Sequence, residues 1–331
     1  MTKQHKSKNS QMSLNKNKYL QQVLESYKMK HVSDLMEKYI EKREVVKDAL
    51  VEKFKDQIVT GAINSGSYAK HDAINTKFDL DICQPFKRNA FYTLEEMADA
   101  VFDFFNEEFE DDDLVAYATR KQRVSTGITF VIDGDEIQMD IVPGRELSAD
   151  DYVNTHRLNL YVRPKLLESA STTQTNIQKH IDLVKGKTAE REIIRLLKVW
   201  KINKNKKRVK SFFVELITIK AFEKCSDVPT GIWEKLEMVL EYIRDNVQTI
   251  RLEDPANSTN VVSNTMTDSE KENLHWEMKQ MLELIESSDE NLKSYFPVND
   301  EFFEEEDEED KTDAALEIAR SGVVQKPWCR F

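Results

Sequence analysis

The stretch that decides the fold reads Phe78-Asp79-Leu80-Asp81-Ile82. In a β-strand successive side chains point to opposite faces, so a strand here sends Asp79 and Asp81 to one face and the apolar residues to the other. A second stretch with the same alternation reads Glu136-Ile137-Gln138-Met139-Asp140-Ile141-Val142-Pro143, and it places Asp140 on its polar face. If the two strands are neighbours, three carboxylates converge.

Three neighbouring carboxylates favour a bound cation. Two unit charges ~4 Å apart repel by about 4 kcal/mol at an effective dielectric near 20. Ligands that are all oxygen select a hard divalent ion, which here means Mg²⁺ or Mn²⁺. Two such ions can hold the attacking and the leaving oxygen of an in-line phosphoryl displacement. The alternative is that Asp79 and Asp81 are solvated carboxylates on an edge strand.

The loop Gly66-Ser67-Tyr68 precedes the first of these strands and is expected to open a helix. Its glycine lets the backbone approach a phosphate closely. The exposed N–H groups and the hydroxyl of Ser67 can then hold the terminal phosphates of a nucleoside triphosphate. Lys70 and His71 lie beside this loop, as phosphate contacts or as ordinary exposed helix residues.

The composition is that of a globular protein with a heavily charged surface. The chain has 331 residues, of which 40% are hydrophobic and 33% charged, enough for two lobes with their own cores. It contains no run of eighteen apolar residues, and its first residues are polar, so we expect a cytoplasmic protein without a membrane partner. Cys83, Cys225 and Cys329 are too widely spaced for a zinc site and are expected to be free thiols, with Cys83 in the core.

The net charge of -12 argues against a protein that coats nucleic acid, because such binding depends on Lys and Arg displacing counterions. The charge is unevenly distributed. Basic residues gather between Lys198 and Lys210, and acidic residues between Glu301 and Asp310. The simplest interpretation is a solvated loop and an acidic linker.

The remaining pattern predicts an α+β fold. Helical spacing covers residues 19–57, strand-like residues occupy 58–63, and an amphipathic helix follows at 94–105. Asp133-Gly134 suits a tight hairpin turn before the strand of Asp140, because Gly tolerates a positive φ. Four further helices are expected at 188–202, 211–224, 232–247 and 269–287.

These motifs carry a family resemblance. Gly66-Ser67, then Asp79-x-Asp81, then Asp140 in a later strand resemble the polymerase-beta-like nucleotidyltransferase superfamily. The second half resembles oligoadenylate synthases and the bacterial type of cGAS/DncV-like nucleotidyltransferases (CD-NTases), over about residues 55–290. The segments that carry this second resemblance are 195–201 (RLLKVWK), 211–216 (SFFVEL) and 252–255 (LEDP), with Asn257 and Asn260.

The resemblance implies roles for particular residues. Asp79 and Asp81 would be ligands of both metal ions, and Asp140 would bind the ion at the acceptor hydroxyl. Gly66, Ser67, Lys198 and Ser211 would surround the triphosphate. Phe212 would stack on a base, at a position that is often Tyr in relatives.

The residues of the second half also allow other readings. Arg191, Arg195 and Lys198 fall on one cationic stripe of a helix, which turns Lys198 towards a cleft, but Lys198 can also be a surface lysine. Ser211 can be the N-cap of its helix, and Phe212 a core aromatic.

The expected architecture has two lobes with a cleft between them. A flexible arm (1–17) precedes a polymerase-beta-like nucleotidyltransferase lobe with a mixed sheet and long N-terminal helices (18–170). A helical lobe (171–300) and an acidic linker with a C-terminal tail (301–331) follow.

The expected function is template-independent, Mg²⁺- or Mn²⁺-dependent synthesis of a cyclic or linear oligonucleotide second messenger from nucleoside triphosphates, in bacterial anti-phage signalling. No nucleic-acid activator is expected, because the chain is acidic and lacks a zinc-bound thumb. The C-terminal tail, which carries Trp328 and Phe331, either packs on the body or binds a protein regulator. The alternatives are transfer of a single nucleotide to a protein, an RNA end or a small molecule, and a catalytically silent nucleotide-binding module.

Overall fold

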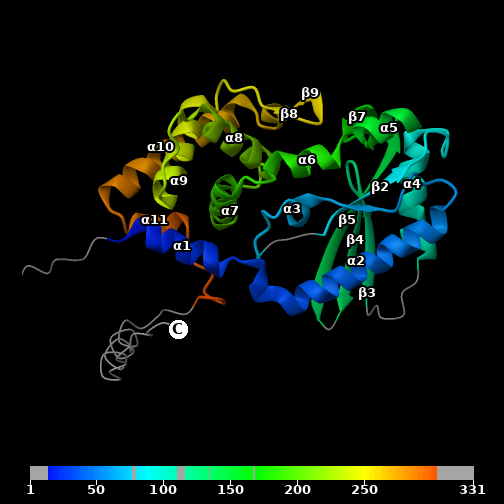
Figure 1. Ribbon diagram of the computed structural model, residues 1–331, viewed down its shortest axis with the longest axis horizontal. Coiled ribbons are helices and arrows are strands. Elements are labelled where there is room, and N and C mark those ends of the chain that lie inside the picture. Colours follow the sequence, from blue (N-terminus) through cyan, green and yellow to red (C-terminus); the bar gives the residue numbers. More distant parts are fainter. Residues whose placement is uncertain (1–13, 77–79, 110–115, 133, 167, 304–331) are drawn as a thin grey trace, which may run out of the picture.

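The computed structural model describes residues 14–76, 80–109, 116–132, 134–166 and 168–303. The elements of the first half, in order, are α1 (Lys16–Ser26), the 3₁₀-helix η1 (Met29–Val32), α2 (Ser33–Phe54), β1 (Ile63–Asn64), α3 (Gly66–Ala69), β2 (Ile82–Phe86), α4 (Leu94–Asp103), the π-helix η2 (Phe104–Glu108), β3 (Ala116–Lys121), β4 (Thr126–Ile132), β5 (Asp135–Glu146), α5 (Ala149–Thr155), β6 (Leu158–Val162) and β7 (Ser171–Thr175) (Figure 1).

The second half is mostly helical. Its elements are α6 (Ile177–Val184), α7 (Thr188–Asn203), α8 (Ser211–Lys224), α9 (Ile232–Asn246), β8 (Glu253–Asp254), β9 (Asn257–Val261), the 3₁₀-helix η3 (Val262–Thr265), α10 (Asp268–Ser287) and α11 (Asn291–Tyr295). All four predicted helices of this half are present, with ends that differ from the expected ones by no more than one residue at either side.

The mixed sheet has the strand order β1-β2-β5-β4-β3, and β6 joins β5 and β7. Strands β2 and β5 are parallel, whereas the other pairs are antiparallel. The predicted hairpin between β4 and β5 is confirmed, since Ile132 pairs with Asp135 and Gly134 has a φ of 91°. The centre of the sheet therefore lies at β5, the strand of Asp140.

Helices α2 and α4 cover one face of this sheet. Val46 and Leu50 of α2 and Met97 of α4 share a core with Phe130 of β4 and Met139 of β5. Figure 1 shows α2 lying across the strands. Because residues alternate along a strand, Asp140 lies on the opposite face of β5, away from this core.

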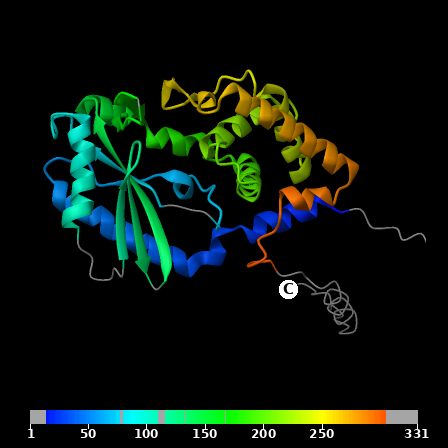
Figure 2. The ribbon, with the colours of Figure 1, turned by 180° about the vertical axis from the view of Figure 1, so that it is seen from behind.

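A second core holds the helical half of the chain together. It contains apolar residues of α7, α8, α9 and α10, and Leu20 and Val23 of α1 belong to it as well. Both ribbon views place α1 beside α9 and α11 and away from the sheet (Figures 1 and 2). The expected catalytic lobe began at residue 18, but the apolar side chains of α1 are buried in the helical core. The other expected boundaries stay predictions.

Two strand predictions need correction. Of the strand expected at 58–63, only Ile63 is in a strand, and Ile58 forms an isolated bridge with Phe86. The side-chain amide of Gln84 donates to the Thr60 carbonyl (2.8 Å), which takes the place of a ladder bond. Of the strand expected from Phe78, Leu80 and Asp81 lie before β2, which begins at Ile82, and Phe78 and Asp79 are outside the described residues.

Other findings concern membrane spans, cysteines and the two ends of the chain. No helix in the described ranges is long and apolar enough to cross a membrane. Cys83 and Cys225 are free thiols, and Cys83 is buried as expected. Cys329, the tail from residue 304 onward and the first thirteen residues lie outside the described part of the chain.

Candidate active site

The loop at Gly66 is pressed against Asp81. The backbone N–H of Ser65 donates to the Asp81 carbonyl (2.7 Å), which brings the start of α3 beside the residue that precedes β2. Gly66 has a φ of 73°, and a Cβ built on it would overlap the Asp81 carboxylate. Only glycine fits here, because the loop lies close to the Asp81 carboxylate. The close approach of this loop to a phosphate stays a prediction.

Asp81 and Asp140 lie side by side because of the strand register. In the parallel pair of β2 and β5, Ile82 is opposite Ile141, so the two aspartates precede paired residues. Both line one cavity of about 310 Å³. The convergence of carboxylates that the sequence predicted is thus present for these two.

Asp79 lies outside the described residues, so its place in the site remains a prediction. No group of three or more His, Cys, Asp or Glu side chains that could hold a metal ion is found within the described ranges, from which Asp79 is missing. Asp81 and Asp140 on a shared cavity fit a hard divalent ion, since both offer carboxylate oxygens from adjacent strands.

Gln122 orients the Asp140 carboxylate. Its Nε2 donates to Asp140 Oδ1 (2.7 Å), and Ser125 Oγ donates to Gln122 Oε1 (3.0 Å). Gly127 makes room for this side chain, because a Cβ at Gly127 would overlap Gln122 Nε2. Sequence reasoning missed Gln122, which follows β3 and comes near Asp140 only through the antiparallel pairing of β4 with β5.

A larger cavity of about 600 Å³ opens on the other side of Gly66. It lies between the α3 loop and helices α7 and α8, and it contains four of the predicted triphosphate residues and Phe212. Its basic lining comes from Lys70, Lys198, Lys201, Lys206, Lys207 and Lys210. The basic segment that looked like a plain solvated loop therefore borders a cavity.

Lys198 lies in a buried ionic cluster at this cavity. Only 7% exposed, it places Nζ 2.7 Å from Asp72 Oδ1 and donates to the Asp72 carbonyl (3.0 Å). Glu215 is 3.9 Å from Lys198 Nζ and accepts a hydrogen bond from Lys70 Nζ (2.6 Å). The helix face predicted for Lys198 does border the cavity, but its ammonium group already faces two carboxylates. The alternative that Lys198 is a surface lysine is therefore wrong.

The charges of this cluster are strongly desolvated. Asp72 is fully buried. Its Oδ1 lies 2.7 Å from Lys198 Nζ, but the two carboxylate oxygens accept no hydrogen bond with good geometry in the described part of the chain. Burial raises the pKa of Glu215 above its ordinary value, although the charges of Lys70 and Lys198 oppose this. The cluster joins the α3 loop to α7 and α8, and hence the sheet half of the molecule to the helical half.

Ser211 and Phe212 sit at the start of α8 and both border the larger cavity. Helix α8 begins at Ser211 with Lys210 in the cap position, so the reading of Ser211 as the N-cap is wrong. Its Oγ instead accepts a hydrogen bond from Lys201 Nζ (2.8 Å). Lys201 comes one turn after Lys198 on α7, the spacing that should have drawn attention to it.

Phe212 borders both cavities and is partly buried against the helical core. Its ring centroid lies 5.0 Å from that of His180, and Lys70 Nζ lies 5.6 Å from its ring. The stacking role and the core role that the sequence left open are therefore compatible.

His180, on α6, is a further residue that the sequence did not indicate. Its Nε2 lies 2.7 Å from Asp254 Oδ1, and Ala256 N–H (2.8 Å) and Asn260 Nδ2 (3.1 Å) also donate to that carboxylate. Burial raises the pKa of Asp254, but the hydrogen bond and charge of His180 and the other donors outweigh burial and leave the pKa below its ordinary value. Asp254 is thus held ionised as an acceptor for His180.

The fold of the chain is that of the bacterial cGAS/DncV-like nucleotidyltransferases (CD-NTases), built from a polymerase-beta-like mixed sheet and a helical part. The structure of E. coli MS115-1 CdnC with ATP matches 87% of this chain and 98% of its own, with a TM-score of 0.66 and 20% identity.

Two other solved structures agree. Bradyrhizobium diazoefficiens CdnG in complex with GTP matches 84% of this chain and 94% of its own, with a TM-score of 0.64 and 11% identity. Vibrio cholerae DncV, a cyclic AMP-GMP synthase, matches 71% of this chain and 68% of its own, with a TM-score of 0.54 and 11% identity. No protein-family profile and no curated protein matches the chain in sequence. The resemblance stated from the motifs is therefore confirmed in the fold.

Proposed function

We propose that this protein synthesises a cyclic or linear oligonucleotide second messenger from nucleoside triphosphates, without a template and with Mg²⁺ or Mn²⁺, in bacterial anti-phage signalling. The observation that carries this proposal is the pairing of two cavities at Gly66. One holds Asp81 and Asp140, and the other is lined by lysines, Ser67 and Ser211. The ATP and GTP named for CdnC and CdnG, and the cyclic AMP-GMP named for DncV, favour the same chemistry here.

The residues divide the task between the two cavities. Ser67 and Ser211, with the neighbouring lysines, hold the triphosphate in the larger one. Asp81 and Asp140, together with Asp79, would hold two divalent ions, which would stabilise the charge that develops on phosphate oxygens. Gln122 keeps the Asp140 carboxylate in position.

The reaction transfers a nucleotidyl group to a hydroxyl. The acceptor oxygen forms a bond to the α-phosphorus of the donor, and the bond between that phosphorus and the α,β-bridging oxygen breaks. Pyrophosphate leaves. The acceptor hydroxyl loses its proton beside the Asp140 carboxylate, and the proton passes to solvent. A second transfer within the linear product would close the ring.

Incubation of the purified protein with Mg²⁺ and all four labelled nucleoside triphosphates tests the proposal. We expect a product that resists phosphatase and does not form in EDTA. The product should form without added DNA or RNA, and synthesis should continue after nuclease treatment of the enzyme, because the chain has a net charge of -12. Labelling of an added protein, RNA or small molecule instead would favour single-nucleotide transfer. Binding without turnover would favour a silent module.

A protein regulator at the C-terminal tail stays part of the proposal. Deletion of residues 321–331 tests it. If the tail packs on the body, its removal should lower the melting temperature of the protein. An unchanged melting temperature and unchanged basal synthesis would favour a tail that is available to a partner.

A further inference from the structure

We propose that His180 selects the nucleobase bound at the smaller cavity, by a hydrogen bond from its ring beside Phe212. The inference rests on the proposed function, because it takes the ligand to be a nucleoside triphosphate. It assigns a specificity-determining role to a residue outside the metal and phosphate groups.

Part of the lining of the smaller cavity is apolar. Phe212, Ile177, Ile181 and Val142 contribute to it, and His180 lines the same cavity with a hydrogen-bonding side chain. Gln122 and Ser125 are on the carboxylate side and are engaged with Asp140 and each other. An apolar wall with few polar groups suits a nucleobase, whose faces stack and whose edge needs a partner.

Phe212 cannot supply that partner, since its ring carries no polar atom. The His180 ring meets it at 5.0 Å and 60°, so a base stacked on Phe212 would bring an edge to the imidazole. Lys70 lies on the same ring, but its ammonium is bound to Glu215. The structure thus offers His180 as the group that reads the base.

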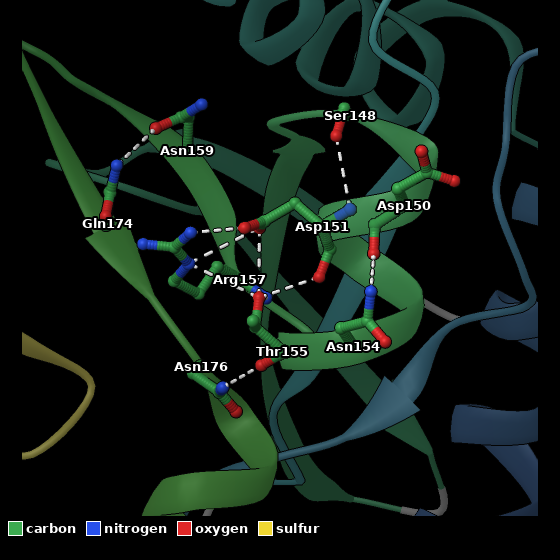
Figure 3. Close-up of polar contacts among 9 residues, drawn as sticks. All are labelled: Ser148, Asp150, Asp151, Asn154, Thr155, Arg157, Asn159, Gln174 and Asn176. Atoms are coloured by element: carbon green, nitrogen blue, oxygen red, sulfur yellow. Dashed lines mark hydrogen bonds and ion pairs between the residues drawn. The ribbon is translucent and has the colours of Figure 1, made fainter.

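Two groups of contacts fix the orientation of His180. The first lies at the start of α6, where Asn176 accepts from Lys179 N–H (3.0 Å) and donates to the Thr155 carbonyl, beside the ion pair of Arg157 with Asp151 (Figure 3). This network holds α6 against α5, so the helix that carries His180 has a fixed beginning.

The second group lies at the turn of β8 and β9. Asp254 is held by Ala256 N–H and Asn260, and its carboxylate accepts from His180 Nε2. Because a carboxylate oxygen accepts, Nε2 carries the proton of this hydrogen bond, and Nδ1 is the ring nitrogen left for a ligand. The Asp254 motif noted in the sequence therefore sets the orientation of His180. The ligand group that fits is the hydrogen-bonding edge of a nucleobase.

The test measures binding of the α,β-methylene analogues of ATP, GTP, CTP and UTP, each alone with Mg²⁺, by calorimetry. The wild-type protein should prefer one base. His180→Phe keeps a ring against Phe212 and removes both nitrogens, so its preference should shrink by about fivefold to tenfold, the loss of one hydrogen bond. Asp254→Asn retains the imidazole and should lose part of the preference. It serves as the second variant if the first is unstable.

The matched control is His275→Phe, because His275 is also partly buried and its Nδ1 donates one hydrogen bond to the Arg244 carbonyl (2.6 Å), but it lines neither cavity. It should leave the preference among bases unchanged. Equal affinities for all four analogues in the wild type, or an unchanged preference in His180→Phe and Asp254→Asn, would overturn the role of His180. The synthase activity is tested separately, by product formation. A protein that discriminates bases through His180 but makes no product loses only the synthase assignment, whereas no binding of any analogue overturns both.

Discussion

Asp140 is positioned by a neighbour rather than by its strand alone. Strand β5 fixes the Cα of Asp140, but the direction of the carboxylate depends on the 2.7 Å hydrogen bond from Gln122. Groups that orient a metal ligand commonly change metal affinity or activity by about 10-fold to 100-fold when they are removed. The activity should therefore be sensitive to Gln122, which is not one of the expected metal ligands.

The first prediction is that Gln122→Ala lowers kcat by about tenfold or more, with a small change in melting temperature. Raising the Mg²⁺ concentration should recover part of the loss. Gln178→Ala is the control, since Gln178 bonds to Asp182 on the exposed side of α6. Unchanged kinetics of Gln122→Ala across Mg²⁺ concentrations would contradict the positioning role.

The second prediction concerns the thiols. Cys83 is fully buried, and burial raises its pKa to about 12, whereas Cys225 is partly exposed. Because the thiolate is the reactive form, iodoacetamide at pH 8 should modify Cys225 and spare Cys83 in the folded protein. Peptide mass spectrometry measures this, and denaturant should make both react. Rapid labelling of native Cys83 would mean that β2 opens readily.

At the scale of elements, the ionic cluster at Lys198 connects α3, α7 and α8. Breaking a buried ion pair by removing one partner typically costs about 3–5 kcal/mol, because a charge is left buried and alone. Removing both partners can cost much less. The cluster therefore contributes to the stability of the junction and borders the proposed nucleotide site.

The third prediction is that Lys198→Ala lowers the free energy of unfolding by about 3–5 kcal/mol and also weakens nucleotide binding. The double variant Lys198→Ala with Asp72→Ala should lose less stability than the sum of the two single variants. Lys220→Ala is the control, since its pair with Glu223 is exposed and should be worth less than about 1 kcal/mol. Urea unfolding of the wild type and of the four variants measures these losses. Additive losses would show that the 2.7 Å pair contributes nothing of its own.

Local pattern predicted the elements that contain their own signals. Helix α8 starts at Ser211 as expected, and the alternation around Asp140 predicted its face of β5 correctly. The contacts that sequence reasoning missed join distant residues. His180 meets Asp254 74 residues away, and Lys198 meets Asp72 126 residues away. No periodicity within one element contains such information, so the fold class and the carboxylates were accessible and the groups that orient them were not.

At the scale of the whole molecule, two halves with separate cores border the proposed nucleotide site. One core lies under the sheet and the other within the helical bundle that includes α1. The larger cavity takes its walls from both, with Ser67 and Asp81 from the sheet half and Ser211 and Phe212 from the helical half. A ligand in this cavity contacts both halves at once, so its binding energy should couple their unfolding.

The last prediction is that a nucleoside triphosphate analogue with Mg²⁺ stabilises both halves together. A ligand at a hundred times its Kd adds about 2.7 kcal/mol to the stability of the state that binds it. Hydrogen exchange should therefore slow in β5 and in α7 by similar free energies, although these elements belong to different cores. The variant Asp81→Asn with Asp140→Asn should lose most of this effect, because both side chains line the cavity on which the ions are expected. Protection confined to β5, with α7 exchanging as it does without ligand, would mean that the nucleotide is held by the sheet half alone and that Ser211 and the lysines of α7 do not contact the triphosphate.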